Sequence, residues 1–329
     1  MNERLCDRFT GSLLGGMIGD IIGAVVEGES PRYIRKTFSS IDDMLAIEHV
    51  EEILGRKWLV GQFTDDTIMS LDVAEWLLED PQLDGKSLLT RFNQSFRPAR
   101  RYGSGTALIL ESFERNPPDW RALATLMFPE GSYGNGSAMR AGPIGCYFHR
   151  DPAGLIKAAR TSSITTHSHP LAVQGAIVQA AAVAAAIRMP APLQTGEFLQ
   201  SLGEVLEKLP NDTTIYREAL QILSRGLAER REPSEMAQIL GNGIEAREAV
   251  PMAIYCFLSN WQSFERVIHE AVFIGGDTDT IASMAGSICG AFGGLAHIPR
   301  HWLARVREDH YTPARVKGIA EALCARMAI

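Results

Sequence analysis

Apolar residues recur at helical spacing along most of the chain. Residues 67–78 (TIMSLDVAEWLL) repeat apolar positions with the period of an α-helix, and residues 264–273 separate an apolar face from a charged one. A further segment, residues 313–327, is amphipathic with a basic outer face. Strand-type alternation of β-branched residues is hard to find anywhere. The pattern predicts an all-α protein.

Proline and glycine mark where several of these helices begin and end. Pro170 opens an alanine-rich helix that is expected to end before Pro190, and Pro233 opens another that is expected to end at Gly241. The connections at residues 190–195 and 211–214 are short, and no linker separates the helices into groups. We therefore expect residues 1–329 to form a single compact multi-helix domain.

The first predicted helix carries glycine at every fourth position, so that the glycines share one face. Glycine inside a helix costs roughly 1 kcal/mol relative to alanine, so this stripe needs a compensating contact. A weaker stripe follows near the other end of the chain. The two stripes are Gly11, Gly15, Gly19 and Gly23, and Ala282, Gly286 and Gly290. Tight packing against another helix and close approach of a ligand both remain open as explanations.

Composition argues against a nucleic-acid-binding protein and against a membrane-spanning one. The chain has 329 residues, and 46% of them are hydrophobic, which is enough apolar material for a large core. Its net charge is −7. It contains no basic run, so nucleic-acid binding is not expected. Two apolar stretches, residues 13–26 and 171–187, are interrupted by Asp20 and by glutamines, and we interpret both as buried helices rather than membrane spans. The chain start lacks a signal-peptide pattern, which favours a cytoplasmic protein.

The cysteines give a weak indication of redox environment. The five cysteines are scattered, odd in number and never arranged as CxxC. This pattern favours a reducing compartment and argues against a disulfide framework or a zinc-thiolate site.

Candidate chemistry lies in two similar segments, QFTDDTI at residues 62–68 and GGDTDTI at residues 275–281. One acidic or hydroxyl side chain before a helix is commonly an N-cap, but one cap needs one side chain, and each segment offers four acidic or hydroxyl side chains. If the two helix starts meet, Asp65, Asp66, Asp277 and Asp279 converge, and four carboxylates at short range need neutralising cations. An all-oxygen donor set suits Mg²⁺ or Mn²⁺ better than zinc. The alternative is that the two segments are independent helix N-caps, each with more polar side chains than a cap uses.

Four motifs occurring together resemble the ADP-ribosylglycohydrolase family. They are GDIIGAVVEG near the N-terminus, TDDT, SYGNGSAMRAGPIG in the middle and GGDTDTIA, and the resemblance runs from about residue 9 to about residue 294. It implies a compact all-α fold with a central binuclear site for two Mg²⁺ or Mn²⁺ ions. It also implies that Glu27, at the end of GAVVEG, is an acidic residue on a mobile loop over the metals. The implied metal ligands are Thr64, Asp65, Asp66, Asp277, Asp279 and Thr280.

The middle motif is expected to bind rather than react. Its glycines allow backbone N–H groups to approach phosphate oxygens closely, although a lone Gly-Asn-Gly is more often an ordinary turn. The resemblance implies contacts of this loop with the diphosphate and ribose of ADP-ribose, Phe128 on the adenine and His167 near the phosphates. His169 is expected only to begin the helix at Pro170. The loop residues are Gly131, Ser132, Tyr133, Gly134, Asn135 and Gly136.

The resemblance implies a metal-dependent hydrolase that cleaves the glycosidic bond between ADP-ribose and a modified protein side chain. Glu27 would move protons, with Asp66 or Asp277 as candidates to share the base role. Two alternatives remain: a non-catalytic relative, either an ADP-ribose-binding or a crystallin-like structural protein, and a hydrolase of a small ADP-ribosyl metabolite. The sequence leaves the arginine or serine linkage open. We expect a monomer whose partner is an ADP-ribosylated protein.

Overall fold

The computed structural model describes residues 3–55, 57–115, 119–307 and 310–327. Within these residues every regular element is helical, and the only β-type pairings are two isolated bridges, His49 with Leu59 and Gly134 with Glu245. The all-α prediction is therefore confirmed. The α-helices are α1 (Glu3–Gly23), α2 (Pro31–Thr37), α3 (Ile41–Ala46), α4 (Glu51–Leu54), α5 (Asp65–Glu79), α6 (Gly85–Ser95), α7 (Ser104–Phe113), α8 (Gly142–Tyr147), α9 (Pro152–Ile164), α10 (Pro170–Arg188), α11 (Thr195–Leu206), α12 (Thr214–Ala228), α13 (Pro233–Leu240), α14 (Ala246–Asn260), α15 (Phe264–Phe273), α16 (Thr278–Gly293), α17 (Arg300–Leu303) and α18 (Pro313–Arg326). Four short 3-10 helices are η1 (Pro98–Arg100), η2 (Trp120–Thr125), η3 (Asn135–Ser137) and η4 (Leu295–His297).

The sequence signals place most of these helix ends. The alanine-rich helix begins at Pro170 and ends before Pro190, and α13 ends against Gly241, which has a φ of +88°. His169 is the N-cap of α10, as expected, because its ring nitrogen accepts a hydrogen bond from the Leu171 N–H. Helix periodicity and capping chemistry were thus sufficient to find these elements.

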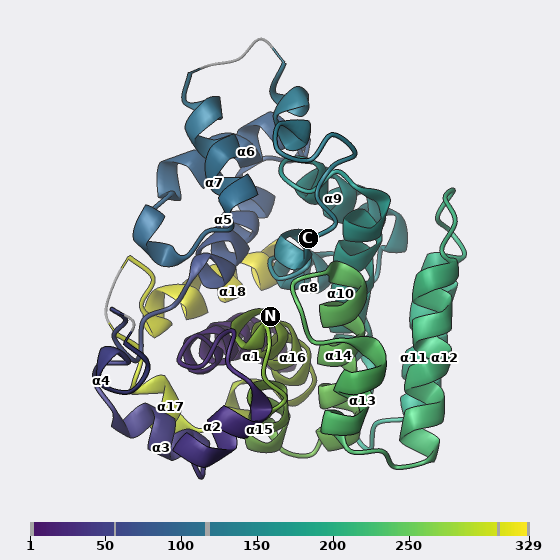
Figure 1. Cartoon of the computed structure of the whole chain (residues 1–329). Coiled ribbons are helices and arrows are strands. Elements are labelled where there is room, and N and C mark those ends of the chain that lie inside the picture. Colours follow the sequence, from purple (N-terminus) through teal and green to yellow (C-terminus); the bar gives the residue numbers. More distant parts are fainter. Residues whose placement is uncertain (1–2, 56, 116–118, 308–309, 328–329) are drawn as a thin grey trace.

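Helices α1 and α16 form the centre of the molecule, where they lie side by side (Figure 1). They are antiparallel, since Gly11 faces Gly290 and Gly23 faces Thr278. A Cβ built on Gly11, Gly15, Gly19 or Gly23 would lie within 3.0 Å of backbone atoms of α16. The two stripes therefore face each other, and tight helix packing accounts for them.

The remaining helices surround this pair. Helix α5 packs on α1, α6 and α18, while α10 packs on α8, α9, α11, α14 and α16. Helices α11 and α12 lie at one edge (Figure 1). Among the described helices, α10 is long and apolar enough to cross a membrane, but 89% of its apolar window is buried inside the fold. That burial agrees with its interpretation as a core helix.

The cysteines differ from the expectation in one respect. Cys6 in α1 and Cys324 in α18 form a disulfide bond, whereas the cysteine pattern was interpreted as arguing against a disulfide framework. The partners are 318 residues apart, and only the packing of α18 on α1 brings them together. Cys146, Cys256 and Cys289 are free and buried.

Candidate active site

The start of α5 is held by a buried carboxylate of α1. Asp20 accepts hydrogen bonds from the backbone N–H of Thr64 at 3.0 Å and of Thr67 at 3.1 Å, and from the Thr67 hydroxyl. Burial raises the pKa of this carboxyl to about 6, although the hydrogen bonds from both threonines oppose that shift. Asp20 therefore fixes where Asp65 and Asp66 stand relative to α1.

The start of α16 is shaped by two glycines with positive φ. Gly275 and Gly276 have φ of 71° and 78°, values that favour glycine. The Asp277 N–H donates to the backbone carbonyl of Asn242 at 2.9 Å, and the Gly28 N–H donates to that of Gly276 at 2.7 Å. The second bond ties the residues after α1 to the entrance of α16.

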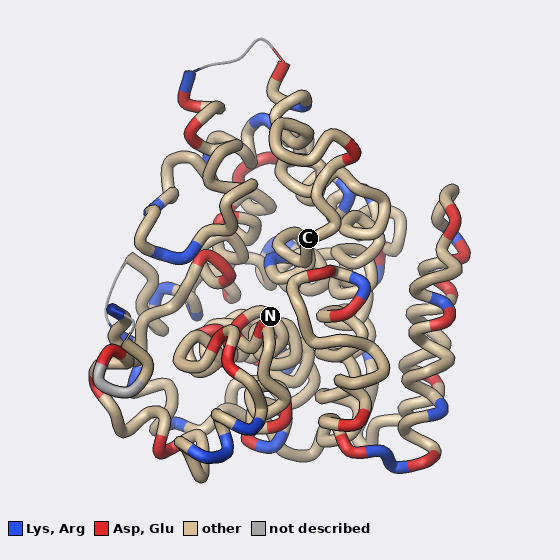
Figure 2. Tube along the Cα trace, viewed as in Figure 1, with Lys and Arg blue, Asp and Glu red and all other residues tan. Residues whose placement is uncertain are grey.

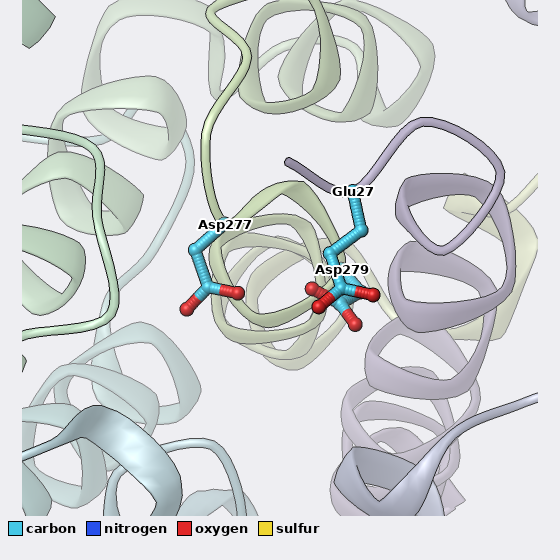
Figure 3. A group of neighbouring side chains, drawn as sticks. All are labelled: Glu27, Asp277 and Asp279. Carbon is cyan, nitrogen blue, oxygen red and sulfur yellow. The ribbon is translucent and has the colours of Figure 1, made fainter. Parts of the chain in front are cut away.

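These elements bring the acidic side chains together. One carboxylate oxygen from each of Glu27, Asp277 and Asp279 lies within 4.8 Å of the other two, and Figure 3 shows the three side chains gathered at the start of α16. The hydroxyl of Thr280 lies 3.5 Å from Oδ2 of Asp66. A pocket of about 230 Å³ is lined by the acidic residues of both segments and by Glu27. Its acidic lining residues are Glu27, Asp65, Asp66, Asp277 and Asp279.

The electrostatics of this cluster call for a cation. Burial, and then repulsion from neighbouring carboxylates, raises the pKa of Asp65, Asp66 and Asp279 well above the ordinary value. Burial also raises the pKa of Asp277, although a hydrogen bond from Asn135 opposes the shift. Oδ1 of Asp66 is buried and has no hydrogen-bond partner among the described residues. Buried, mutually repelling carboxylates with an unused oxygen fit a hard divalent cation, so this cluster could hold a metal ion.

The other wall of the pocket is the middle motif. Ser132, Gly134, Asn135 and Gly136 line it, and Asn135 donates its side-chain amide to Asp277. A Cβ built on Gly136 would lie 2.7 Å from Cε1 of His167, so glycine allows the ring to pack against this loop. Phe128 and Met127 complete the rim, where both are partly exposed.

His167 is held as a neutral ring at this wall. Its Nδ1 lies 2.7 Å from the Thr166 hydroxyl. Burial, followed by the charge of Arg140, lowers the pKa of His167 to about 3. A neutral imidazole suits hydrogen bonding to a ligand rather than proton transfer near neutral pH.

Three of the expected site residues do not line the pocket. Thr64 is the N-cap of α5, where its hydroxyl accepts from the Asp66 N–H and lies 3.3 Å from Oδ2 of Asp66. Gly131 has a φ of +84° and packs against Ser168 and His169, so it shapes the turn. The ring of Tyr133 is about half exposed and packs edge-on against His169. All the other expected site residues line the pocket.

Three residues with a part in this site were not found from the sequence. Asp20 carried a signal, since an acidic residue inside an apolar helix needs a buried partner. Arg140 is fully buried and donates to Gly136, Ser162 and Thr166, which supports the loop and the residue before His167. Arg101 lines the pocket beside Glu27. Arg140 stands within the motif SYGNGSAMRAGPIG but was given no role from the sequence, and nothing in the local pattern marks Arg101.

The fold and the pocket together define an all-helical protein with an acidic, oxygen-lined centre beside a ligand-sized cavity. Comparison with known proteins gives the family. A family model described as ADP-ribosylglycohydrolase matches residues 1–328. The ADP-ribosylhydrolase ARH3 of Xenopus tropicalis is 33% identical over 355 residues, covering 97% of each chain. The ADP-ribosylhydrolase ARH3 of Homo sapiens is 32% identical over 338 residues, covering 91% of this chain and 89% of its own.

A solved structure described as an ADP-ribosylglycohydrolase-related protein complex is similar over 100% of both chains, with a TM-score of 0.73 and 25% sequence identity. The chain therefore belongs to the ADP-ribosylglycohydrolase family. It is a hydrolase acting on ADP-ribosyl groups, which confirms the enzyme interpretation over a non-catalytic one.

Proposed function

We propose that the protein is a metal-dependent hydrolase that cleaves the glycosidic bond between ADP-ribose and a protein side chain. The observation that carries the proposal is that both acidic helix starts and Glu27 line one pocket, whose opposite wall is the glycine-rich loop. The acidic side would hold two Mg²⁺ or Mn²⁺ ions at Asp65, Asp66, Asp277, Asp279 and Thr280. When bound, such ions supply a water of lowered pKa and stabilise developing negative charge.

Other residues that line the pocket would bind the ADP-ribose or transfer the proton. Backbone N–H groups of the glycine-rich loop and the neutral ring of His167 would bind the diphosphate, and Phe128 would pack against the adenine. Glu27 is the carboxylate suited to take a proton from the attacking water or to give one to the leaving side chain at the anomeric carbon of the ribose. Its side chain is 35% exposed and lines the pocket. Asp66 and Asp277 are more buried and lie within the cation cluster.

The charges at the pocket favour an oxygen-linked acceptor such as serine over arginine. A guanidinium leaving group would need a free carboxylate outside the cation cluster. Among the described residues that line the pocket, Glu27 is the acidic side chain nearest that role, and it already pairs with Arg101 at 2.9 Å.

A side-by-side assay tests the proposal. Peptides carrying ADP-ribose on serine or on arginine are incubated with the protein in Mg²⁺ or Mn²⁺, in EDTA, and after the metal is restored, and the released nucleotide is identified by mass. We expect intact ADP-ribose from the serine peptide, loss of activity in EDTA and recovery with metal. Release of AMP would indicate phosphoanhydride cleavage instead, and no product from either peptide would refute the function.

A matched pair of substitutions on α5 controls for general effects of removing a buried carboxylate. Asp66→Asn removes an acidic group that lines the pocket, whereas Asp72→Asn removes one that lies outside it. We expect the first to lose nearly all turnover, because changing even a residue that only supports a metal ligand costs about tenfold to a hundredfold, and the second to retain it. Equal losses in both variants would mean that the pocket carboxylates have no special role.

A further inference from the structure

Arg101 adopts a backbone conformation that is unusual for its residue type. It directly follows η1 and has a φ of +64°, in the left-handed region. Among the described non-glycine residues, only Leu83 and Arg230 also have positive φ. Such conformations persist where the surrounding structure imposes them, and they are concentrated at functional sites. The contacts of Arg101 show what imposes it here.

The guanidinium of Arg101 joins two parts of the segment that follows α1. Its NH1 donates to the backbone carbonyl of Ala24 at 2.8 Å and to Oε2 of Glu27 at 2.9 Å. The guanidinium also lies over the ring of Trp58, 4.1 Å from the ring centroid, and that ring is only 5% exposed. The buried indole holds the plane of the guanidinium, and NH1 of that plane lies within hydrogen-bond distance of Glu27.

Glu27 needs such a partner because its carboxylate stands beside like charges. It lies in a turn, residues 24–28, which we name the Glu27 turn together with residue 29, whose N–H bonds back to Val26. One of its carboxylate oxygens is within 4.8 Å of oxygens of Asp277 and Asp279, and these carboxylates repel it. Arg101 is the one lysine or arginine among the described residues that line this pocket. Its charge therefore offsets the repulsion at the position where Glu27 is required.

We propose that Arg101 is a positioning residue: its bonds to Ala24 and Glu27 hold the Glu27 turn in place, so that the Glu27 carboxylate faces the sugar. The proposal rests on the proposed function for the role of Glu27 in turnover. Arg101 acts through Glu27 and not on the substrate. Both hydrogen bonds come from NH1, and the planar guanidinium also stacks on Trp58, so a lysine, whose ammonium can donate but cannot stack in this way, would keep only part of the effect.

The neighbouring Arg97 supplies a matched control. It belongs to the same loop and donates to the carbonyls of Gln94 and Phe96. It lines a different cavity and does not touch the Glu27 turn. Arg97→Ala therefore removes an equal charge from the same loop but leaves the hydrogen bonds of Arg101 to Ala24 and Glu27 in place.

The first test is a double-mutant cycle between Arg101 and Glu27. Arg101→Asn removes the charge with a residue that tolerates positive φ, and it should lower kcat by about tenfold to a hundredfold, a large part of what a placed acid or base contributes. The KM and the dissociation constant for ADP-ribose should stay within about twofold, and Arg101→Lys should recover part of kcat. In a Glu27→Gln background, Arg101→Asn should cause no further loss. An equal loss in both backgrounds, or much weaker ADP-ribose binding, would overturn the proposal.

The second test does not depend on turnover. Amide hydrogen exchange of Gly28 and Glu29 in the metal-free protein reports opening of the Glu27 turn, since these N–H groups bond to Gly276 and Val26. Exchange should be faster in Arg101→Asn than in wild type or Arg97→Ala, with helices elsewhere unchanged. Unchanged exchange would overturn the proposal. If the wild type releases no ADP-ribose at all, the proposed function fails, while this measurement still decides whether Arg101 holds the turn.

Discussion

Replacing Gly19 by alanine tests how closely α1 and α16 are packed. A Cβ built at this position would lie within 3.0 Å of three backbone atoms of α16, including the nitrogen of Ser283 at 2.8 Å. Backbone atoms cannot rotate away as a side-chain tip can, so the two helices would have to separate. Gly16 in the same helix is the matched control, because its nearest neighbours would be at an ordinary 3.6 Å.

The expected magnitude follows from two opposing contributions. Both substitutions gain helix propensity of about 1 kcal/mol relative to glycine. Only Gly19→Ala also adds a methyl group to a filled contact, which costs about 1–3 kcal/mol and occasionally more. Because the propensity gain is common to both variants, the difference in their free energies of unfolding isolates the packing cost. We expect that difference to be about 3 kcal/mol, with Gly16→Ala at or above wild type.

The assay is urea denaturation followed by far-ultraviolet circular dichroism, with the metal concentration held constant for all three proteins. The midpoint of Gly19→Ala should fall and that of Gly16→Ala should not. Mn²⁺ affinity should fall with the first variant as well, because Asp277 and Asp279 move with the start of α16. A difference in free energy of unfolding below about 0.5 kcal/mol, typical of uninvolved positions, would refute the packing argument.

Buried carboxylates give three further predictions. Asp279→Ala should abolish the rise in melting temperature that Mn²⁺ causes in the wild type. At a free Mn²⁺ concentration of about one hundred times the dissociation constant, binding would stabilise the wild type by about 2.7 kcal/mol. An equal rise in both proteins would exclude this residue as a ligand. Asp20→Asn turns an amide NH₂ toward donors and should lower the free energy of unfolding by about 1–3 kcal/mol in urea, so an unchanged midpoint would contradict its anchoring role. Burial raises the pKa of Asp72 to about 7 from an ordinary 3.8, so the folded protein holds a proton that the unfolded chain releases between those values. Stability should therefore fall as pH rises through this window, and Asp72→Asn should flatten the slope; a slope equal to that of wild type would count against it.

The helices could be predicted because their signals are local. Prolines at first turns, glycine after the last turn and apolar periodicity all act within a few residues, and α10, α13 and α15 follow them. The two acidic segments were visible for a related reason, since each carries more oxygen-bearing side chains than a helix cap uses.

Other features depend on packing between distant segments, and the local sequence does not show which segment is the partner. The pairing of Cys6 with Cys324 requires α18 to lie on α1. The contact of Arg101 with Glu27 requires the loop after η1 to return to the end of α1. The glycine stripe was recognised, but its explanation stayed open until α16 was seen opposite it. In each case the sequence shows the residue but does not show which distant residue or helix it contacts.

The pairing of α1 with α16 has a consequence for folding during synthesis. The ribosome makes residues 3–23 well before residues 278–293, which form the helix that covers their glycine face. Until residues 278–293 have been made, the glycine face of α1 lacks the helix that it packs against, and contacts this distant in sequence form slowly. We expect nascent chains of this protein to need protection from aggregation until residues 278–293 have been made, and the acidic pocket to appear only after that point.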